Sequence, residues 1–209
     1  MENLKRLLKP LVRLSRRTIE AKSGILMAQA VCGARKGESC DGKLAPPVSK
    51  VGGVRAGFPL SQSAFEKRVE QGNELYELVI DNTPVSYGWV AGGGARVGVL
   101  HNIELTVPDQ AIYVWDCATA PAFRGHGHFQ SLLKAILAAH VSGTTALVAV
   151  DSKNDASRTA LRKAGFRPMF SYFSIRIFGY VIFSAVVEAG ELKKAQPRFD
   201  VLTAQMNQA

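Results

Sequence analysis

The chain has 209 residues, 47% of them apolar and 21% charged, with 26 Lys and Arg against 17 Asp and Glu and a formal net charge of +9. This composition fits one main globular domain with modest additions and argues against a disordered, fibrous or low-complexity protein. Such an excess of positive charge suits a nucleic acid, a membrane or an anionic ligand as partner. It lies in the N-terminal part of the chain, since residues 1–60 carry a net +8 and residues 61–209 only +1.

Residues 1–17 have the pattern of a basic amphipathic helix, which Pro10 should kink or split. Three roles stay open for this arm: packing on the domain or on a partner subunit of a homodimer, peripheral contact of residues 4–17 with anionic lipid, and nucleic-acid binding. No aromatic residues interleave with the cations, so we expect no nucleic-acid partner. The apolar positions are Leu4, Leu7, Leu8, Leu11 and Leu14, and the cations are Lys5, Arg6, Lys9, Arg13, Arg16 and Arg17.

The next segments join this arm to the body of the protein. Ile25–Val31 is a short apolar run that fits a first strand, and residues 33–57 are rich in Gly, Pro, Ser and Lys, as in a linker. Leu60–Gln71 has a helical pattern that Ser61 or Ser63 can cap. We therefore expect an arm and linker over residues 1–57.

The body alternates strands and helices. The order strands, helix, strand, helix, strands indicates an α/β or α+β domain over residues 58–187, and the polar segment 188–209 is expected to be a loosely held tail. The expected strands are 75–80 and 85–91 in one hairpin, 97–107, 111–118, 145–150 and those from Pro168 onward, and the expected helices are 130–141 and 156–164.

Cysteine usage and hydropathy bear on location. Cys32, Cys40 and Cys117 are odd in number and follow no metal-ligand spacing, which favours free thiols in a reducing cytoplasm. No secretory signal is visible. Phe170–Val187 is barely long enough to cross a bilayer, and two core strands with a break near Gly179 explain it better.

Residues 118–133 form the most informative loop, because glycines stand between a strand and an apolar-periodic helix. Such a loop turns backbone N–H groups outward at a helix start and can bind a pyrophosphate. A P-loop is excluded because no Lys-Ser/Thr follows the glycines. A dinucleotide fingerprint is excluded because its third glycine is missing.

This loop resembles motif A of the GCN5-related N-acetyltransferases, the GNAT superfamily. That motif reads Gln/Arg-x-x-Gly-x-Gly/Ala after a strand, and residues 121–127 read Pro-Ala-Phe-Arg-Gly-His-Gly, with Phe129 in place of the last small residue. Residues 154–166, which open with Asn154 and close with Gly165-Phe166, are similar to motif B. The resemblance covers roughly residues 58–180. It implies a mixed, mostly antiparallel sheet of six to seven strands flanked by helices.

The resemblance also implies a mechanism. Family members transfer an acyl group from acetyl-CoA or another acyl-CoA directly to an amine, and no metal is implied. The pyrophosphate would lie on the N–H groups of residues 125–129, the pantetheine would pair with Cys117–Thr119, and the N–H of Ala118 could polarise the thioester carbonyl. The implied cofactor-binding residues are Cys117, Ala118, Thr119, Arg124, Gly125, His126, Gly127, His128, Phe129, Asn154 and Ser157.

The acid and the base are less defined. Asp116 is the first candidate for the base that takes a proton from the amine, and Glu104 and Tyr113 are weaker ones. The family often protonates the leaving thiolate with a Tyr where this chain has Leu161. Tyr172 or a water could substitute, or the thiolate, whose thiol has a pKa of about 8.5, could leave without an acid.

Other roles for nearby residues have less support. Cys117 has no paired base for covalent catalysis, and it is expected to be buried. His126 and His128 lack the carboxylate support that a metal site would need.

Several alternatives stay open. The acceptor can be a small molecule or a peptide with a primary amine. The donor can be an acyl carrier protein, which would dock on the basic arm, and the acceptor can be a membrane-associated precursor. The protein can also be a CoA-binding regulator without activity, a reading that Leu161 favours.

Overall fold

The computed structural model of the protein describes residues 19–31, 48–50, 61–100 and 103–208. The predicted basic helix of residues 1–17 and most of the predicted linker lie outside these ranges.

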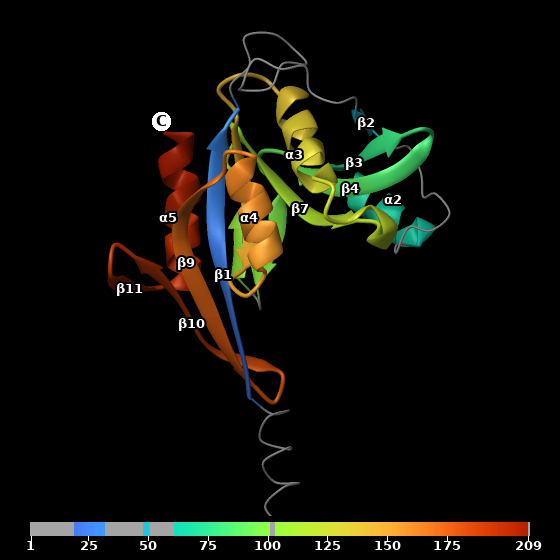
Figure 1. Ribbon diagram of the computed structural model, residues 1–209. Helices are drawn as coiled ribbons and strands as arrows, with labels where there is room; N and C mark the ends of the chain where they lie inside the picture. Colours follow the sequence, from blue (N-terminus) through green and yellow to red (C-terminus); the bar gives the residue numbers. More distant parts are fainter. Residues whose placement is uncertain (1–18, 32–47, 51–60, 101–102, 209) are drawn as a thin grey trace, which may run out of the picture.

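One sheet of nine strands forms the centre of the described chain (Figure 1). The predicted mixed, mostly antiparallel sheet is confirmed, because every pairing in it is antiparallel except that of β7 with β8, although it has more than the six or seven strands expected. The order is β11-β10-β9-β1-β8-β7-β4-β3-β2. The bounds are β1 Ile19–Ala30, β2 Val48–Lys50, β3 Asn73–Ile80, β4 Thr83–Ala91, β7 Ala111–Thr119, β8 Thr145–Asp151, β9 Arg167–Ile177, β10 Tyr180–Glu188 and β11 Glu191–Lys194.

The strand β1 lies inside the sheet, between β8 and β9, although it comes first among the described elements. Leu26 packs in the core on one face of the sheet and Met27 in the core on the other, and both are buried. A strand covered on both faces is a continuous apolar run, which is why Ile25–Val31 was recognisable as a strand. Its central position involves pairings with residues more than 100 positions away.

Helices cover both faces of the sheet. The helices α3, His128–Ala138, and α4, Asp155–Lys163, pack on one face. The helix α5, Ala195–Asn207, packs on the other face, and α2, Gln62–Glu70, contacts β3. The predicted cap of α2 is confirmed, since the Ser61 hydroxyl accepts a hydrogen bond from the N–H of Ala64.

Two expectations from the sequence are wrong. The segment 97–107 is not one strand but a hairpin of β5, Arg96–Leu100, with β6, Ile103–Thr106, in a separate two-stranded sheet. The segment from residue 188 is not a loosely held tail, because it forms β11 and α5. Phe199 and Leu202 lie on one stripe of α5 and are buried, so a narrow apolar stripe is enough to hold a mostly polar helix on the sheet.

The apolar segment Phe170–Val187 forms β9 and β10, joined at Phe178-Gly179, as the break near Gly179 predicted. None of the helices in the described ranges is both long enough and apolar enough to span a bilayer.

Candidate functional site

The strands β7 and β8 separate at the point where the site begins. They pair in parallel only from Ala111 and Thr145 to Val114 and Val148, and β7 then continues to Thr119 beside β4 alone. The edge of β7 that faces away from β4 is therefore open over its last residues. An open strand edge offers backbone N–H and C=O groups to a ligand.

A bulge in β7 adjoins this opening. The register between β4 and β7 shifts so that Gly88 faces the two residues Asp116 and Cys117, and Asp116 has a φ of 43°. A Cβ atom at Gly88 would lie 2.7 Å from the Cys117 sulfur and 3.4 Å from Leu132 of α3. A side chain at Gly88 would therefore collide with the Cys117 sulfur, so this glycine of β4 leaves room for the Cys117 side chain beside α3.

A cleft of about 800 Å³ lies between the end of β7, the glycine loop and the starts of α3 and α4. It brings together ten of the eleven residues expected to bind the cofactor; His126 does not line it. The ten are Cys117, Ala118, Thr119, Arg124, Gly125, Gly127, His128, Phe129, Asn154 and Ser157. Two segments that are 30 residues apart in the sequence thus form one site.

The glycine loop presents a row of unused backbone donors to this cleft. Gly125 and Gly127 have φ values of 82° and 79°, and a Cβ atom on either would meet no atom within 4 Å. The first helical bond of α3 runs from the N–H of Ser131 to the carbonyl of Gly127, so the helix begins two residues earlier than predicted. In the described part of the chain, no backbone carbonyl accepts from the N–H groups of residues 125–130. These groups and the helix dipole make an anion site.

The side chains of the loop add a positive charge, from Arg124, and make contacts that hold the loop in place. Arg124 donates from Nε to the carbonyl of Thr119 at 3.1 Å. The rings of His126 and His128 are stacked with centroids 5.9 Å apart, and Phe123 meets His128 edge-on. Phe129, the departure from motif A, packs partly against the core and also lines the cleft.

The register decides which backbone groups of β7 face the cleft. The N–H of Ala120 donates to the carbonyl of Val85 on β4, and the carbonyl of Ala118 accepts from the Ser86 hydroxyl. Because the backbone alternates along an antiparallel ladder, the N–H of Ala118 also points at β4, whereas those of Cys117 and Thr119 point at the open edge. Ala118 lines the cleft, but the oxyanion role expected for its N–H does not fit this direction.

Asn154 opens α4 at the far side of the cleft. Its side-chain oxygen accepts from the N–H of Ser157 at 3.0 Å, which makes it a helix N-cap. Leu161, which stands where the family often has a Tyr, is buried in the core and does not reach the cleft.

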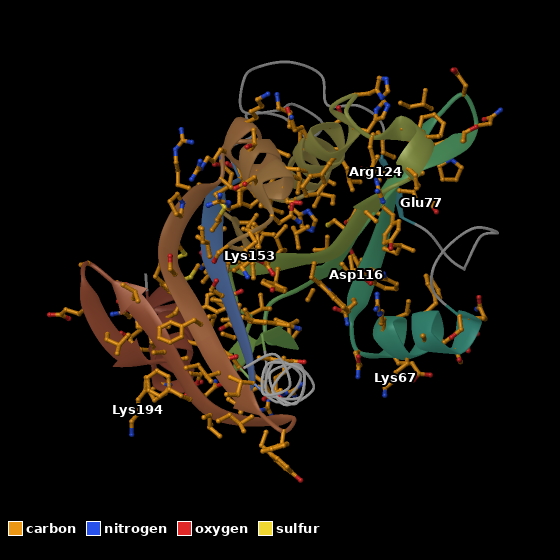
Figure 2. All side chains as sticks on the ribbon, turned by 60° about the horizontal axis from the view of Figure 1, so that its bottom comes forward. Lys67, Glu77, Asp116, Arg124, Lys153 and Lys194 are labelled. Atoms are coloured by element: carbon orange, nitrogen blue, oxygen red, sulfur yellow. The ribbon has the colours of Figure 1, made fainter. Side chains whose placement is uncertain are left out.

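Asp116, the candidate base, is held by Arg68 of α2. The guanidinium donates to Oδ2 of Asp116 at 2.6 Å and lies over the rings of Trp89 and Trp115 at 5.0 and 4.5 Å from their centroids. Figure 2 shows Asp116 on the side of α2 and Arg124 on the side of α3. Burial raises the pKa of the neighbouring Tyr87 phenol, and the charge of Asp116 raises it further.

Asp116 does not line the cleft, although its neighbour Cys117 does, and the other candidate acids and bases do not line it either. Tyr172 crosses Gly24 of β1, where a Cβ would lie 2.5 Å from its hydroxyl, and packs edge-on against Phe199. Burial raises the pKa of the Tyr172 phenol, as do the charges of Tyr113 and Asp151, and burial also raises the pKa of Tyr113. Glu104 forms an ion pair with Arg96 on the β5–β6 hairpin.

Cys117 is a protonated thiol at neutral pH. Burial raises its pKa to about 12, with a smaller contribution from the charge of Asp116. Its sulfur packs under α3 and donates weakly to the carbonyl of Trp115. A thiol in this state does not act as a nucleophile. The expected burial holds only in part, because Cys117 is half-buried and lines the cleft.

Sequence reasoning missed several residues of the site. Phe123, Gln130, Asp155 and Thr159 also line the cleft, and Arg68 holds Asp116 from another element. Asp155 and Thr159 are four residues apart and so lie on the same face of α4. Helix periodicity could therefore have added them to the predicted site. Arg68 precedes Asp116 by 48 residues, and no local pattern connects them.

Comparisons with known proteins identify the relatives of this chain. A sequence model described as the acetyltransferase (GNAT) family matches residues 57–166. Among solved structures, a GCN5-related N-acetyltransferase from Sphaerobacter thermophilus aligns at 13% identity and a TM-score of 0.48 over 85% of this chain and 57% of that one. An acetyltransferase from the GNAT family of Colwellia psychrerythraea aligns at 14% identity and 0.47 over 77% and 56%. This chain thus spans little more than half of the length of these proteins. No curated protein matches it.

Proposed function

Because the chain belongs to the GNAT family of acetyltransferases, we propose that it transfers an acetyl group from acetyl-CoA directly to a primary amine. The observation that carries this proposal is the row of free N–H groups at residues 125–130 along a cleft of about 800 Å³. The pyrophosphate of CoA binds this row, and Arg124 supplies a nearby positive charge.

The pantetheine arm extends along the open edge of β7. Its amides pair with the outward backbone groups of Cys117 and Thr119, in the manner of an added strand. The N–H of Cys117 lies nearest to the point where β7 and β8 separate, so we assign it, in place of Ala118, as the donor that stabilises the oxyanion.

Asp116 orients the acceptor amine. Arg68 occupies its Oδ2, and Oδ1 has no hydrogen bond to any described residue, so it can accept one from the amine. The side chain keeps 40% of its surface exposed, which leaves it accessible. The neutral amine attacks the thioester carbon, the new C–N bond replaces the C–S bond, and the proton of the amine passes to Asp116 or through it to water.

The leaving thiolate is protonated by water. Leu161 has no proton to give, and Tyr172 does not line the cleft. A thiol with a pKa of about 8.5 can leave as the thiolate without a dedicated acid. We therefore expect the rate to depend little on Tyr172.

Turnover with a panel of amines tests the function. Free thiol released from acetyl-CoA is measured with each amine, and each product is identified by mass spectrometry. Release that depends on an amine supports the proposal, whereas tight CoA binding without turnover on any amine indicates a regulatory protein. Turnover with acetylated carrier protein but not with acetyl-CoA assigns the carrier as the donor.

A further inference from the structure

The residues Tyr172, Gly24 and Asp151 lie in one row across three neighbouring strands. Tyr172 of β9 is paired with Gly24 of β1, and Gly24 is paired with Asp151 at the end of β8. Residues that are directly opposite each other on adjacent strands point to the same face of the sheet. The ring of Tyr172 packs edge-on against Phe199 of α5, so the row lies on the face that carries α5.

The hydroxyl of Tyr172 is directed along this row. Because Gly24 has no side chain, the Tyr172 ring crosses it, and a Cβ atom at Gly24 would lie 2.5 Å from the hydroxyl oxygen. Tyr172 is only 2% exposed, yet its hydroxyl forms no hydrogen bond with any described residue. A buried hydroxyl without a partner is costly, and a bound ligand can supply the missing hydrogen bond.

The carboxylate of Asp151 is the next group in the row, and it is exposed. Its Oδ1 accepts a hydrogen bond from the N–H of Lys153 at 2.7 Å, whereas Oδ2 accepts none from the described residues. Lys22 and Lys153 are nearby cations, and neither forms an ion pair with Asp151 among the described side chains. A carboxylate oxygen and a phenol oxygen both accept hydrogen bonds, so together they suit a cationic group.

Asp151 and Asp116 lie on the two sides of the gap between β7 and β8. These strands are last paired at Val114 and Val148, so Asp116 follows the last pair by two residues and Asp151 follows it by three. The two carboxylates are alike in one respect, since each has one oxygen held by the protein and one without a hydrogen bond from a described residue.

Both carboxylates are reached from the same face of the sheet. The ring of Trp115 packs against the apolar cluster under α5 and also against the cluster that holds Phe65 of α2. Arg68 of α2 lies over this ring and binds Asp116. An acceptor amine at Asp116 therefore approaches on the face of α2 and α5, whereas the CoA cleft lies beside α3 and α4.

The spacing of the two carboxylates restricts the acceptor. Paired strands are about 4.8 Å apart, and β7 and β8 diverge beyond their last pair, so the carboxylates are further apart than that. One ammonium group cannot contact both of them. A molecule with two amino groups that are several bonds apart can bind both at once.

We propose that the acceptor carries a second cationic group, as an aliphatic diamine does, and that Asp151 and Tyr172 bind this group while Asp116 orients the amine that reacts. This inference rests on the proposed acetyl transfer and names the class of its acceptor. The reacting amine must be neutral to attack, whereas the remote amine stays protonated near neutral pH. Asp151 and Tyr172 therefore act on binding and take no part in proton transfer.

Kinetics with two amines of equal chain length test the proposal. Hexamethylenediamine and hexylamine differ in the second amino group, and wild type should have a KM at least tenfold lower for the diamine. Asp151→Asn keeps an oxygen for the N–H of Lys153 but removes the charge, so it should raise the KM for the diamine about tenfold with little change in kcat. Tyr172→Phe keeps the ring and should raise this KM about threefold, also with little change in kcat.

The matched control is Glu191→Gln, which removes an exposed carboxylate from β11 at the edge of the sheet. It should leave both KM values as in wild type, because the effect of Asp151 depends on its position and not on the net charge of the protein. Equal KM values for the two amines in wild type would overturn the proposal. A diamine preference that persists in Asp151→Asn would overturn it as well.

Failure of acetyl transfer itself gives a different result, which is no turnover of either amine. Calorimetry of hexamethylenediamine binding to the CoA-saturated protein then decides the question without turnover. Binding that Asp151→Asn weakens about tenfold supports the cation site, whereas no binding, or equal binding by both proteins, overturns it. The affinity for CoA, measured in the same samples, should be the same in all variants.

Discussion

Arg68 donates a 2.6 Å hydrogen bond to Asp116 and so connects α2 to the bulge of β7. The same guanidinium lies over Trp89 and Trp115, which fixes its plane. The ion pair therefore orients the carboxylate that we assign to the acceptor amine, at the place where β7 leaves β8.

Asp116→Asn should lower kcat/KM for the amine at least tenfold and leave the affinity for CoA unchanged. Asn tolerates a φ of 43° as Asp does, so the bulge should persist. Steady-state kinetics with a saturating donor and calorimetry with CoA check the two parts. An equal loss of CoA affinity would show that Asp116 supports the fold of the cleft and not the amine.

Arg68→Gln should destabilise the protein by about 1 kcal/mol, since it removes the ion pair and the cation–π contacts. Arg68→Lys keeps the charge but not the planar stacking, and should recover only part of the stability. Thermal unfolding of both variants measures this, and a Lys variant as stable as wild type would contradict the role of the stacked plane.

Thr119→Pro should weaken CoA binding roughly tenfold, because it removes one N–H from the open edge of β7 and leaves the ladder with β4 intact. Thr119→Ala is the matched control, because it removes the hydroxyl that contacts Ser86 and keeps the N–H. Calorimetric titration with CoA compares the two. Equal affinities would mean that pantetheine does not pair with this edge.

Cys117 should resist alkylation at neutral pH. Its pKa of about 12 leaves only a small fraction as the reactive thiolate, and this fraction grows as the pH rises toward 12. Iodoacetamide labelling, followed by mass spectrometry of the peptide that contains Cys117, should increase steadily between pH 7 and 10 without a plateau. A plateau below pH 9 would show a low pKa and reopen covalent catalysis.

Glu188 should make the protein sensitive to acid. Hydrogen bonds from Arg198 hold the pKa of Glu188 at about 2, below its ordinary value of 4.5. A depressed pKa adds stability that is fully present above pH 4.5 and is lost as the pH falls through 2. Glu188→Gln should melt lower than wild type at pH 7 and lose less stability between pH 4.5 and 2. Parallel melting curves for both proteins over this range would rule out this contribution.

The sequence allowed the cleft to be predicted because its determinants are local. The glycines of residues 125–127 and the cap at Asn154 each define the local backbone within a few residues. The two segments meet because they follow the parallel strands β7 and β8, which end at the same edge of the sheet. The same holds for Ile25–Val31, whose continuous apolar run reflects burial on both faces of the sheet.

Other features depend on partners that are distant in the sequence. The central position of β1 follows from pairing with β8 and β9, and Arg68 meets Asp116 only after α2 has packed beside β3. The helix α5 was missed because only Ala195, Phe199 and Leu202 are buried among polar neighbours. The direction of the Ala118 N–H depends on a strand register, which composition and periodicity do not define.

The most direct test of the proposed CoA site compares Gly127→Asp with Gly127→Asn. Both residues tolerate a positive φ and differ mainly in charge, so only the electrostatic effect on a bound pyrophosphate separates them. Calorimetric titration with CoA should give the Asp variant at least tenfold lower affinity than the Asn variant, a difference of about 1.4 kcal/mol. Equal affinities in the two variants, or no binding of CoA to the wild-type chain, would contradict a pyrophosphate site at the start of α3.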